Sequence, residues 1–389
     1  MSETLKLPNA NGLLEPYAPG PPGHFEKPTQ AFTRRKLFAA AHVVADPRFT
    51  PDPHRPPQID WDATLEYRHH LWSHGFAIAE AMDTAQRGMG LDWTSALKLI
   101  TLSAVEARAC NGGISAGAGT DQLPPLEQGL PTLERIEAAY LEQCELIEAA
   151  GAQVILMASR HLAAVARDAG DFERVSSHVL SQTSQPVILH WLGEMFDPSL
   201  SGYWGSSNLD VAASTVHGLI AAHSSKVDGI KISLLNAQRE IDFRRKLPTG
   251  VSMYTGDDFN YAELIRGDEH GHSDGLLGIF DAIAPAASAA MQALERDDWQ
   301  TYNTLLAPTV PLSRHIFETP TFNYKTGVVF LAYLNGFQSH FRMIAGLETA
   351  RSVLHLSELF KLADRAGLLR DPDLASVRMR DSLSLAGIV

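Results

Sequence analysis

Eight short apolar segments, most of them separated by helical patterns, recur through the middle of the chain. Their residues are apolar without alternation, which is typical of strands covered on both faces and therefore of a parallel sheet. Eight such units over about 260 residues fit an α/β fold of the (β/α)8 TIM-barrel type better than a doubly wound sheet. The expected strands are residues 41–45, 76–81, 113–116, 154–157, 187–189, 227–232, 251–254 and 276–280.

The remaining pattern divides the chain into three parts. Residues 1–35 are rich in proline and glycine and lack periodicity, which predicts an extended N-terminal arm. Residues 36–296 hold the expected barrel, and residues 297–389 are expected to form a C-terminal helical subdomain. Helices are predicted by three- and four-residue apolar spacing at residues 59–75, 93–109, 132–150, 172–180, 209–223, 237–247, 286–296, 299–306, 311–317, 324–341 and 352–366.

Composition excludes several classes of partner. The formal net charge of −13 over 389 residues argues against nucleic acid, because phosphate binding needs a basic surface. No apolar run approaches the roughly 18 residues of a membrane span, so no membrane partner is expected. Two cysteines, Cys110 and Cys144, are too few for a disulfide scaffold and lack the spacing of a zinc site. That usage suits a reducing compartment, and we expect a cytoplasmic protein.

One lysine interrupts an apolar strand. Residues 227–233 read VDGIKIS, so Lys231 lies between Ile230 and Ile232. Burial of an unpaired ammonium is costly, and such a lysine usually has a lowered pKa. A neutral amine is what attack on a carbonyl requires, which makes Lys231 a candidate Schiff-base nucleophile. The alternative is a lysine at a strand end that reaches solvent or pairs with an acid such as Asp257 or Asp258.

Several segments, taken in order, resemble the dihydrodipicolinate synthase and N-acetylneuraminate lyase family of class I aldolases. The resemblance runs from about Ile59 to Gly336 and is distant. It implies a (β/α)8 barrel with a C-terminal helical extension and a Schiff-base lysine on the sixth strand, here Lys231. The matching segments are residues 117–121 (GAGTD), 149–156 (AAGAQVIL), 186–189 (PVIL), 227–231 (VDGIK), 254–258 (YTGDD) and 274–285.

Two departures from that family concern the expected site. Where the family has a tyrosine after the apolar part of strand five, this chain has His190, which can perform the same proton transfers. The family's turn of glycine, threonines and glutamate after strand two is replaced by residues 82–86 (MDTAQ). Acids at the mouth suit the hydroxyl groups of a sugar-like substrate better than the carboxylate of a keto acid. Beside the catalytic pair Lys231 and His190, the expected substrate-binding residues are Asp46, Asp83, Thr84, Gly117, Thr120, Tyr254 and Asp257.

The favoured function is therefore a lyase or aldolase that forms a Schiff base with a small carbonyl compound, such as a keto acid or a sugar-derived keto compound, without a cofactor or metal. A metal-dependent barrel lyase or isomerase is the alternative, with ligands from Asp46, Asp83, His190 and either His270 or His272. A ligand-binding barrel without activity is a third. The family resemblance implies a homodimer or homotetramer.

Overall fold

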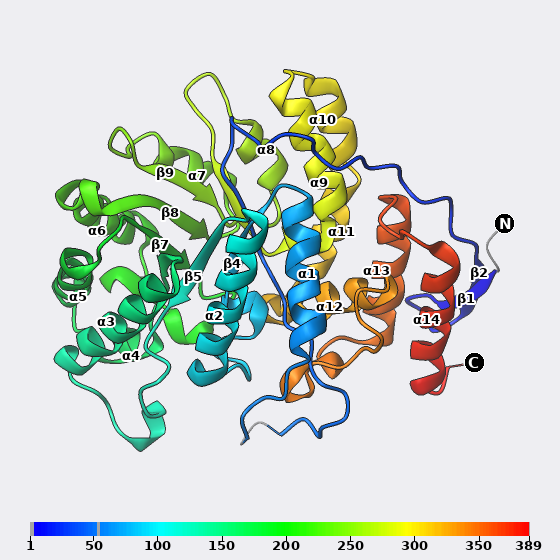
Figure 1. Ribbon diagram of the computed structural model, residues 1–389, viewed down its shortest axis with the longest axis horizontal. Helices are drawn as coiled ribbons and strands as arrows, with labels where there is room; N and C mark the ends of the chain where they lie inside the picture. The colour runs from blue at the N-terminus through cyan, green and yellow to red at the C-terminus, as the bar shows by residue number, and fades with distance from the viewer. Residues whose placement is uncertain (1–3, 53–54, 389) are drawn as a thin grey trace.

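A computed structural model of the chain describes residues 4–52 and 55–388. Within this range, parallel strands close into a barrel in the order β10-β3-β4-β5-β6-β7-β8-β9 (Figure 1). The predicted TIM-barrel fold is thus confirmed. Its strands are β3 (Leu37–Ala40), β4 (Ala77–Glu80), β5 (Ile114–Ala118), β6 (Gln153–Leu156), β7 (Val187–Leu192), β8 (Val227–Ser233), β9 (Ser252–Thr255) and β10 (Asp274–Leu277).

Helices follow the strands and cover the outside of the barrel. Asp60, Asp92 and Thr132 each cap a helix by accepting a hydrogen bond from a first-turn backbone N–H. Gly151, in the left-handed conformation, ends the helix whose apolar stripe the sequence predicts. The helices are α1 (Trp61–Ser73), α2 (Trp93–Cys110), α3 (Leu133–Ala150), α4 (Arg160–Val165), α5 (Ala169–Gln182), α6 (Leu209–Ala222), α7 (Ala237–Arg244) and α8 (Tyr261–Arg266).

The first barrel strand lies earlier than predicted. Residues 41–45 were expected to form it, but β3 ends at Ala40. Beyond that point the backbone amides bond to side chains instead of a neighbouring strand: His42 N–H donates to Asp281 Oδ2 at 2.8 Å, and Val44 N–H donates to Thr64 Oγ1 at 3.0 Å. The apolar character of 41–45 therefore reflects burial rather than pairing in the barrel sheet, and Ala45 instead forms an isolated antiparallel bridge with Ile59.

The barrel is followed by a helical extension. Its α12 ends at Leu334 rather than at residue 341 as predicted, because Asn335 and Gly336, with φ of +80°, turn the chain. The last helix is not anticipated by the sequence pattern. The helices are α9 (Ile279–Glu295), α10 (Trp299–Leu306), α11 (Thr309–Ile316), α12 (Tyr324–Leu334), α13 (Val353–Arg365) and α14 (Pro372–Leu385).

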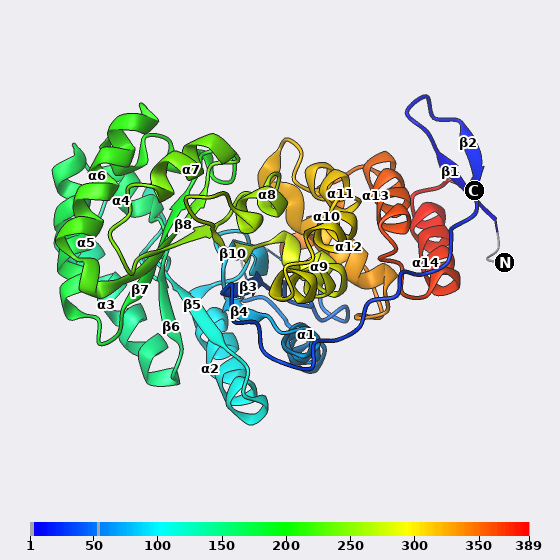
Figure 2. The same cartoon turned by 90° about the horizontal axis from the view of Figure 1, so that it is seen from above.

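The N-terminal segment packs along the extension. A hairpin of β1 (Leu5–Pro8) and β2 (Leu14–Tyr17) lies at the far end from the barrel, beside α13 and α14 (Figure 2). Tyr17 O–H donates to Asp364 Oδ2 at 2.6 Å, and the Thr33 side chain donates to Glu295 at 2.7 Å. The arm is thus bound to the helical extension of its own chain at both ends. The three-part division of the chain remains a prediction.

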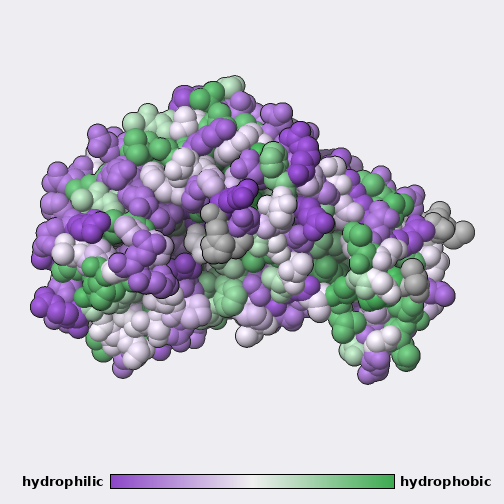
Figure 3. Space-filling model, turned by 90° about the horizontal axis from the view of Figure 1, so that it is seen from below, coloured by the Kyte–Doolittle hydropathy of each residue, from purple (hydrophilic) through white to green (hydrophobic). Residues whose placement is uncertain are grey.

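The surface is mixed in character. Hydrophobic surface is visible at the end of the molecule formed by the hairpin and the last helices (Figure 3). Exposed large apolar side chains of these elements are Leu13, Leu14, Leu354, Val377 and Leu385. In the part of the chain that the structure describes, no helix combines the length and apolarity needed to cross a membrane.

The barrel interior is closed by a compact apolar layer. This layer contains Ala40, Ala79, Met82, Ile155, Ile188, Tyr254 and Leu276. Strand residues of the opposite parity, such as Ile230 and Ile232 on β8, instead pack outward against the helices. Because neighbouring residues of a strand point to opposite faces, Lys231 faces the barrel interior.

Candidate active site

Lys231 is held inside the barrel by its own strand and by β9. The side chain is buried, with 4% of the residue exposed. Its Cε lies so close to Gly256 that a β-carbon built on Gly256 would approach Cε to 2.7 Å. Glycine at 256 is therefore required for the lysine to lie here. Burial lowers the pKa of Lys231, although the carboxylate of Asp83, and that of Asp258 where it is ionised, act against that shift.

His190 is the neighbour of Lys231 on the adjacent strand. The two residues are paired in the register of β7 and β8, and both are buried. The Nε2 atom of His190 lies 3.3 Å from Ser233 Oγ, two residues after the lysine. Burial, reinforced by the charge of Lys231, holds the pKa of His190 well below its usual value. The imidazole is consequently neutral at pH 7 and able both to accept and to donate a proton.

Asp83 faces these two residues from the turn after β4. Burial alone would raise the pKa of Asp83, but the charges of Lys325 and Lys231 and a hydrogen bond from Tyr324 hold it below its usual value. Lys325 Nζ lies 4.0 Å from Asp83 Oδ2. Burial lowers the pKa of Lys325 to about 8, although the charge of Asp83 acts against that shift. Tyr324 O–H donates to Asp83 Oδ2 at 2.7 Å and lies 2.7 Å from Thr84 Oγ1.

Asp258 brings a further carboxyl close to Lys231. It is buried, and burial raises its pKa to about 8 despite the nearby lysine. One oxygen accepts the backbone N–H of Ile279 at 2.8 Å, at the start of α9. Asp258 therefore carries a proton through much of the neutral range, while Asp83 is ionised. Carboxyl groups held in opposite protonation states are an arrangement suited to acid and base roles.

A cavity of about 510 Å³ opens at the carboxyl ends of the strands. Asp83, Thr120, His190 and Lys325 contribute to its wall. Lys231 does not line it, and lies next to His190 and within electrostatic reach of Asp83. Ion pairs also occur on the wall, between Arg87 and Asp121 at 2.5 Å and between Arg160 and Asp197 at 2.6 Å. This end of the barrel is where TIM-barrel enzymes have their active sites.

The other predicted substrate-binding residues have different positions. Thr84 is buried, with its hydroxyl engaged by Tyr324. Gly117 lies within the barrel, where an added β-carbon would approach Met157 Sδ to 2.7 Å. Thr120 is at the cavity wall, hydrogen bonded to Ser159 Oγ at 2.6 Å and to His161 Nδ1 at 3.0 Å.

Tyr254 and Asp257 are engaged away from the cavity. The hydroxyl of Tyr254 donates to Asp228 Oδ2 at 2.5 Å, near the amino end of β8, so its polar atom lies at the opposite end of the barrel. Asp257 accepts hydrogen bonds from the backbone N–H groups of Phe259 and Asn260 and orders the turn before α8. The structure does not bring either polar group to Lys231.

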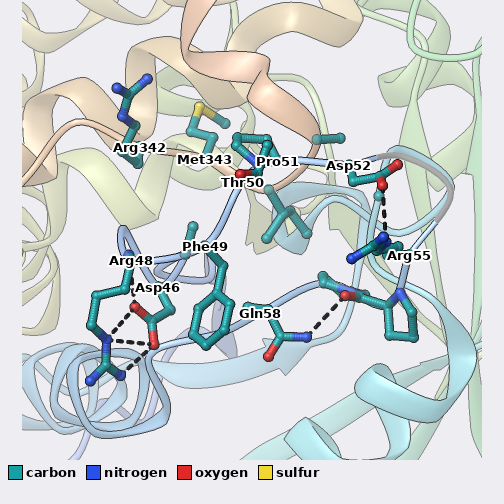
Figure 4. Close-up of a pocket in the computed structure, with 16 residues that line it drawn as sticks. Asp46, Arg48, Phe49, Thr50, Pro51, Asp52, Arg55, Gln58, Arg342 and Met343 are labelled. Atoms are coloured by element: carbon teal, nitrogen blue, oxygen red, sulfur yellow. Dashed lines mark hydrogen bonds and ion pairs between the residues drawn. The ribbon is translucent and has the colours of Figure 1, made fainter.

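Asp46 lies at a second cavity, of about 650 Å³, between the loop after β3 and the segment that contains Met343 (Figure 4). Its carboxylate accepts hydrogen bonds from the Arg48 backbone and guanidinium, which lower its pKa to about 2 (Figure 4). In the alternative metal site Asp46 would join Asp83 and His190. Among the side chains that the structure describes, these three do not lie close enough together to share a metal ion.

The two loop histidines of that alternative lie elsewhere. His270 is exposed, and its Nε2 is 3.2 Å from Glu269. His272 lies by Arg35 and Arg244, whose charges reinforce the lowering of its pKa to about 4 by burial. Neither imidazole has a place in the group around Lys231.

Tyr324 and Lys325 are members of the site that sequence reasoning did not identify. They come from α12, nearly 100 positions after Lys231, at the start of the otherwise apolar run YKTGVVFLAYL. A lone lysine opening a buried apolar helix is the same signal that identified Lys231 on its strand. That signal marks a buried lysine but does not place it at the site, because its proximity to Asp83 depends on how α12 packs against the barrel.

Comparison with known proteins gives a family and a fold. A family model described as "Protein of unknown function (DUF993)" matches residues 5–388. No curated protein matches the chain. Among solved structures, a putative dihydrodipicolinate synthetase from Pseudomonas aeruginosa is 14% identical with a TM-score of 0.65, covering 85% of this chain and 99% of its own. Dihydrodipicolinate synthase from Aquifex aeolicus is also 14% identical, with a TM-score of 0.64 and coverages of 86% and 99%.

A third similar structure is the 4-hydroxy-tetrahydrodipicolinate synthase from Methylacidiphilum fumariolicum SolV. It is 16% identical, with a TM-score of 0.63, and covers 91% of this chain and 98% of its own. The resemblance to dihydrodipicolinate synthases inferred from the sequence is thereby confirmed at the level of the fold. At this identity the likeness shows the arrangement of strands and helices, and does not show the activity.

Proposed function

The chain belongs to the DUF993 family of proteins of unknown function, and from its candidate site we propose that it is a Schiff-base-forming lyase or aldolase. The observation that carries the proposal is the inward-facing, buried amine of Lys231. Burial lowers the pKa of this amine, so a larger fraction is neutral near pH 7 than for an exposed lysine. The neutral amine is the form that attacks a carbonyl carbon.

The first steps follow from the groups around this amine. The nitrogen of Lys231 forms a bond to the carbonyl carbon, and a proton moves from nitrogen to oxygen to give a carbinolamine. Loss of the hydroxyl as water needs an acid, and the resulting iminium withdraws the electron pair of an adjacent C–C or C–H bond. The same early steps serve cleavage, condensation and dehydration.

Proton transfer is assigned to His190 and Asp83. His190 is neutral and adjacent to the lysine, so it can take the amine proton and return it to the departing hydroxyl. Asp83 is ionised and accepts a hydrogen bond from Tyr324, which makes it a base for a substrate hydroxyl at the cavity wall. Protonated Asp258 supplies an acid near Lys231.

The substrate we propose is a small carbonyl compound, either a keto acid or a keto compound derived from a sugar. The ionised Asp83 on the cavity wall would repel a carboxylate placed beside it but would accept a hydrogen bond from a hydroxyl. Lys325 offers the opposite charge within the same wall. A hydroxylated keto compound uses both groups.

Borohydride trapping tests the proposal. The protein is incubated with a panel of keto acids and keto sugars, reduced with borohydride and digested with trypsin. Trypsin cleaves after Lys226 and Lys231, and a reduced adduct on Lys231 blocks the second cut. The expected product is a peptide of residues 227–239 carrying the mass of the reduced substrate. Lys231→Arg should lose this product, and Lys325→Arg should keep it.

Two outcomes would contradict the assignment. An adduct found on the peptide spanning residues 315–342, with none at 227–239, would make Lys325 the nucleophile. Binding of a panel compound without any adduct would instead support a ligand-binding barrel. The expected homodimer or homotetramer is a separate prediction.

A further inference from the structure

Two histidines and a glutamate meet in the helical extension, apart from the cavity. His315 lies in the last turn of α11, Glu318 follows two residues after that helix, and His355 lies in the first turn of α13. The two helices pack side by side in both ribbon views (Figures 1 and 2). One nitrogen of each imidazole and one carboxylate oxygen lie within 4.8 Å of one another.

The hydrogen bonds around His315 leave a lone pair directed at the carboxylate. His315 Nε2 lies 2.9 Å from the backbone carbonyl of His355, and only a protonated nitrogen can donate to that oxygen. In the neutral ring Nδ1 is then bare, and it lies 3.5 Å from Glu318 Oε2. Two lone pairs facing each other at this distance repel unless a proton or a metal ion lies between them. In metal sites, the ring nitrogen that does not bind the metal commonly donates a hydrogen bond to a backbone carbonyl, which fixes the orientation of the ring.

His355 completes the arrangement from the other helix. Its ring stacks on that of His315 with centroids 4.0 Å apart, and its Nδ1 lies 2.8 Å from Glu318 Oε1. His355 is buried, and its Nε2 has no hydrogen-bond partner among the described residues. Both Nδ1 atoms therefore lie next to the carboxylate of Glu318, one at each oxygen.

The surroundings allow a cation with three ligands. The carboxyl end of α11 carries the negative end of its helix dipole and favours positive charge. Arg351 acts in the opposite direction, but its guanidinium is directed at backbone carbonyls, including that of Glu318 at 2.6 Å. The Glu318 side chain is 48% exposed and has room to adjust its position.

We propose that His315, Glu318 and His355 bind one Zn²⁺ ion, with water in the fourth position. Two imidazoles and a carboxylate are a donor set that Zn²⁺ accepts, with bonds of about 2.0–2.2 Å. Tetrahedral bonds of that length place the donors about 3.4 Å apart. The 3.5 Å between His315 Nδ1 and Glu318 Oε2 already matches this separation. The proton that His355 Nδ1 shares with Glu318 leaves when the metal binds.

Such an ion would join α11 to α13 close to the candidate active site. Phe317, between two of the ligands in sequence, stacks on Tyr324 with ring centroids 4.3 Å apart. Tyr324 in turn donates a hydrogen bond to Asp83. The metal would thus stabilise the packing that positions one wall of the cavity, without contacting substrate.

The test is a metal titration of the full chain, stripped with a chelator and free of any purification tag. Co²⁺ is added first, followed by displacement with Zn²⁺. We expect one equivalent of Co²⁺ to give the visible absorption of a tetrahedral site, and Zn²⁺ to remove it. Glu318→Gln and His355→Gln should each weaken binding at least about 100-fold. Zn²⁺ should raise the Tm of the unaltered chain and leave that of Glu318→Gln unchanged.

His270→Gln is the matched control, because His270 and Glu269 form an exposed pair elsewhere in the chain. This variant should bind Co²⁺ as the unaltered chain does. Absence of a tetrahedral Co²⁺ spectrum, or equal affinity in Glu318→Gln, would overturn the proposal. The Glu318 side chain is half exposed, so Glu318→Gln should fold and remain informative even where His355→Gln fails to fold. None of these measurements depends on Lys231, so their outcome is independent of the Schiff-base proposal.

Discussion

Gly256→Ala tests whether the position of the Lys231 side chain, rather than its mere presence, produces the proposed chemistry. Gly256 is on the inner face of the barrel at the end of β9. A β-carbon at this position would lie 2.7 Å from Lys231 Cε, 2.2 Å from Ser233 Oγ and 2.9 Å from the backbone oxygen of Ile232. The backbone oxygen of Ile232 cannot rotate away. The Lys231 and Ser233 side chains therefore have to move to make room for the added β-carbon.

The size of the effect follows from these distances. Carbon atoms in contact are about 3.5–4.0 Å apart, so Lys231 must move by about 1 Å. A displacement of that size in a reacting group can reduce a rate by about 100-fold. Overpacking of a well-filled interior should also lower the free energy of unfolding by about 1–3 kcal/mol. Movement of Ser233 would in addition remove the contact of its hydroxyl with His190.

The assay measures the rate of borohydride trapping at the peptide of residues 227–239, together with unfolding in urea. Gly218→Ala is the matched control, since an added β-carbon at Gly218 in α6 meets nothing within 4 Å. That control should trap at the original rate and be equally or slightly more stable, because alanine favours a helix. Trapping by Gly256→Ala at the original rate, with unchanged stability, would refute the placement of the amine.

Two other predictions use the buried charges. Lys325→Met removes a cation 4.0 Å from Asp83, so the pKa of Asp83, followed by NMR of its carboxyl carbon, should rise. Lys325→Arg should preserve this pKa, and an unchanged pKa in Lys325→Met would contradict the coupling. Glu240 is buried, which raises its pKa from 4.5 to about 8, so the folded chain retains a proton that the unfolded chain releases and stability falls as pH rises between these values. Glu240→Gln should remove that loss, which amounts to at most about 1.4 kcal/mol per pH unit. The free energy of unfolding in urea should therefore change less between pH 5 and pH 8 in Glu240→Gln than in the unaltered chain. An equal change in both proteins would contradict the prediction.

Much of the fold could be predicted because local sequence patterns specify the helices and strands. Residues 132–150 show the apolar stripe, the cap at Thr132 and the closing Gly151, and the helix lies where these signals indicate. The first strand was misplaced because 37–40 and 41–45 are both apolar and buried. Only the hydrogen-bond partners of the backbone amides, which come from Asp281 and Thr64, distinguish strand from loop there.

The site could be predicted only in part, for the same reason. Lys231 is identifiable from its neighbours on one strand, but its inward direction follows only from the packing of Ile230 and Ile232 against the outer helices. Tyr254 has the same parity, yet its hydroxyl bonds to Asp228 near the amino end of the barrel. The direction of a long side chain depends on partners from other elements, which the local sequence does not specify.

By itself, the sequence determined the parallel barrel and the strand that carries Lys231, because periodicity acts over a few residues. Only the tertiary structure decided which groups surround the amine. Asp83 meets Tyr324 and Lys325 across about 240 positions of chain, and their pairing depends on how α12 packs against the barrel mouth. The charge state of each group depends on that meeting, since burial and an opposite charge within about 4 Å set its pKa.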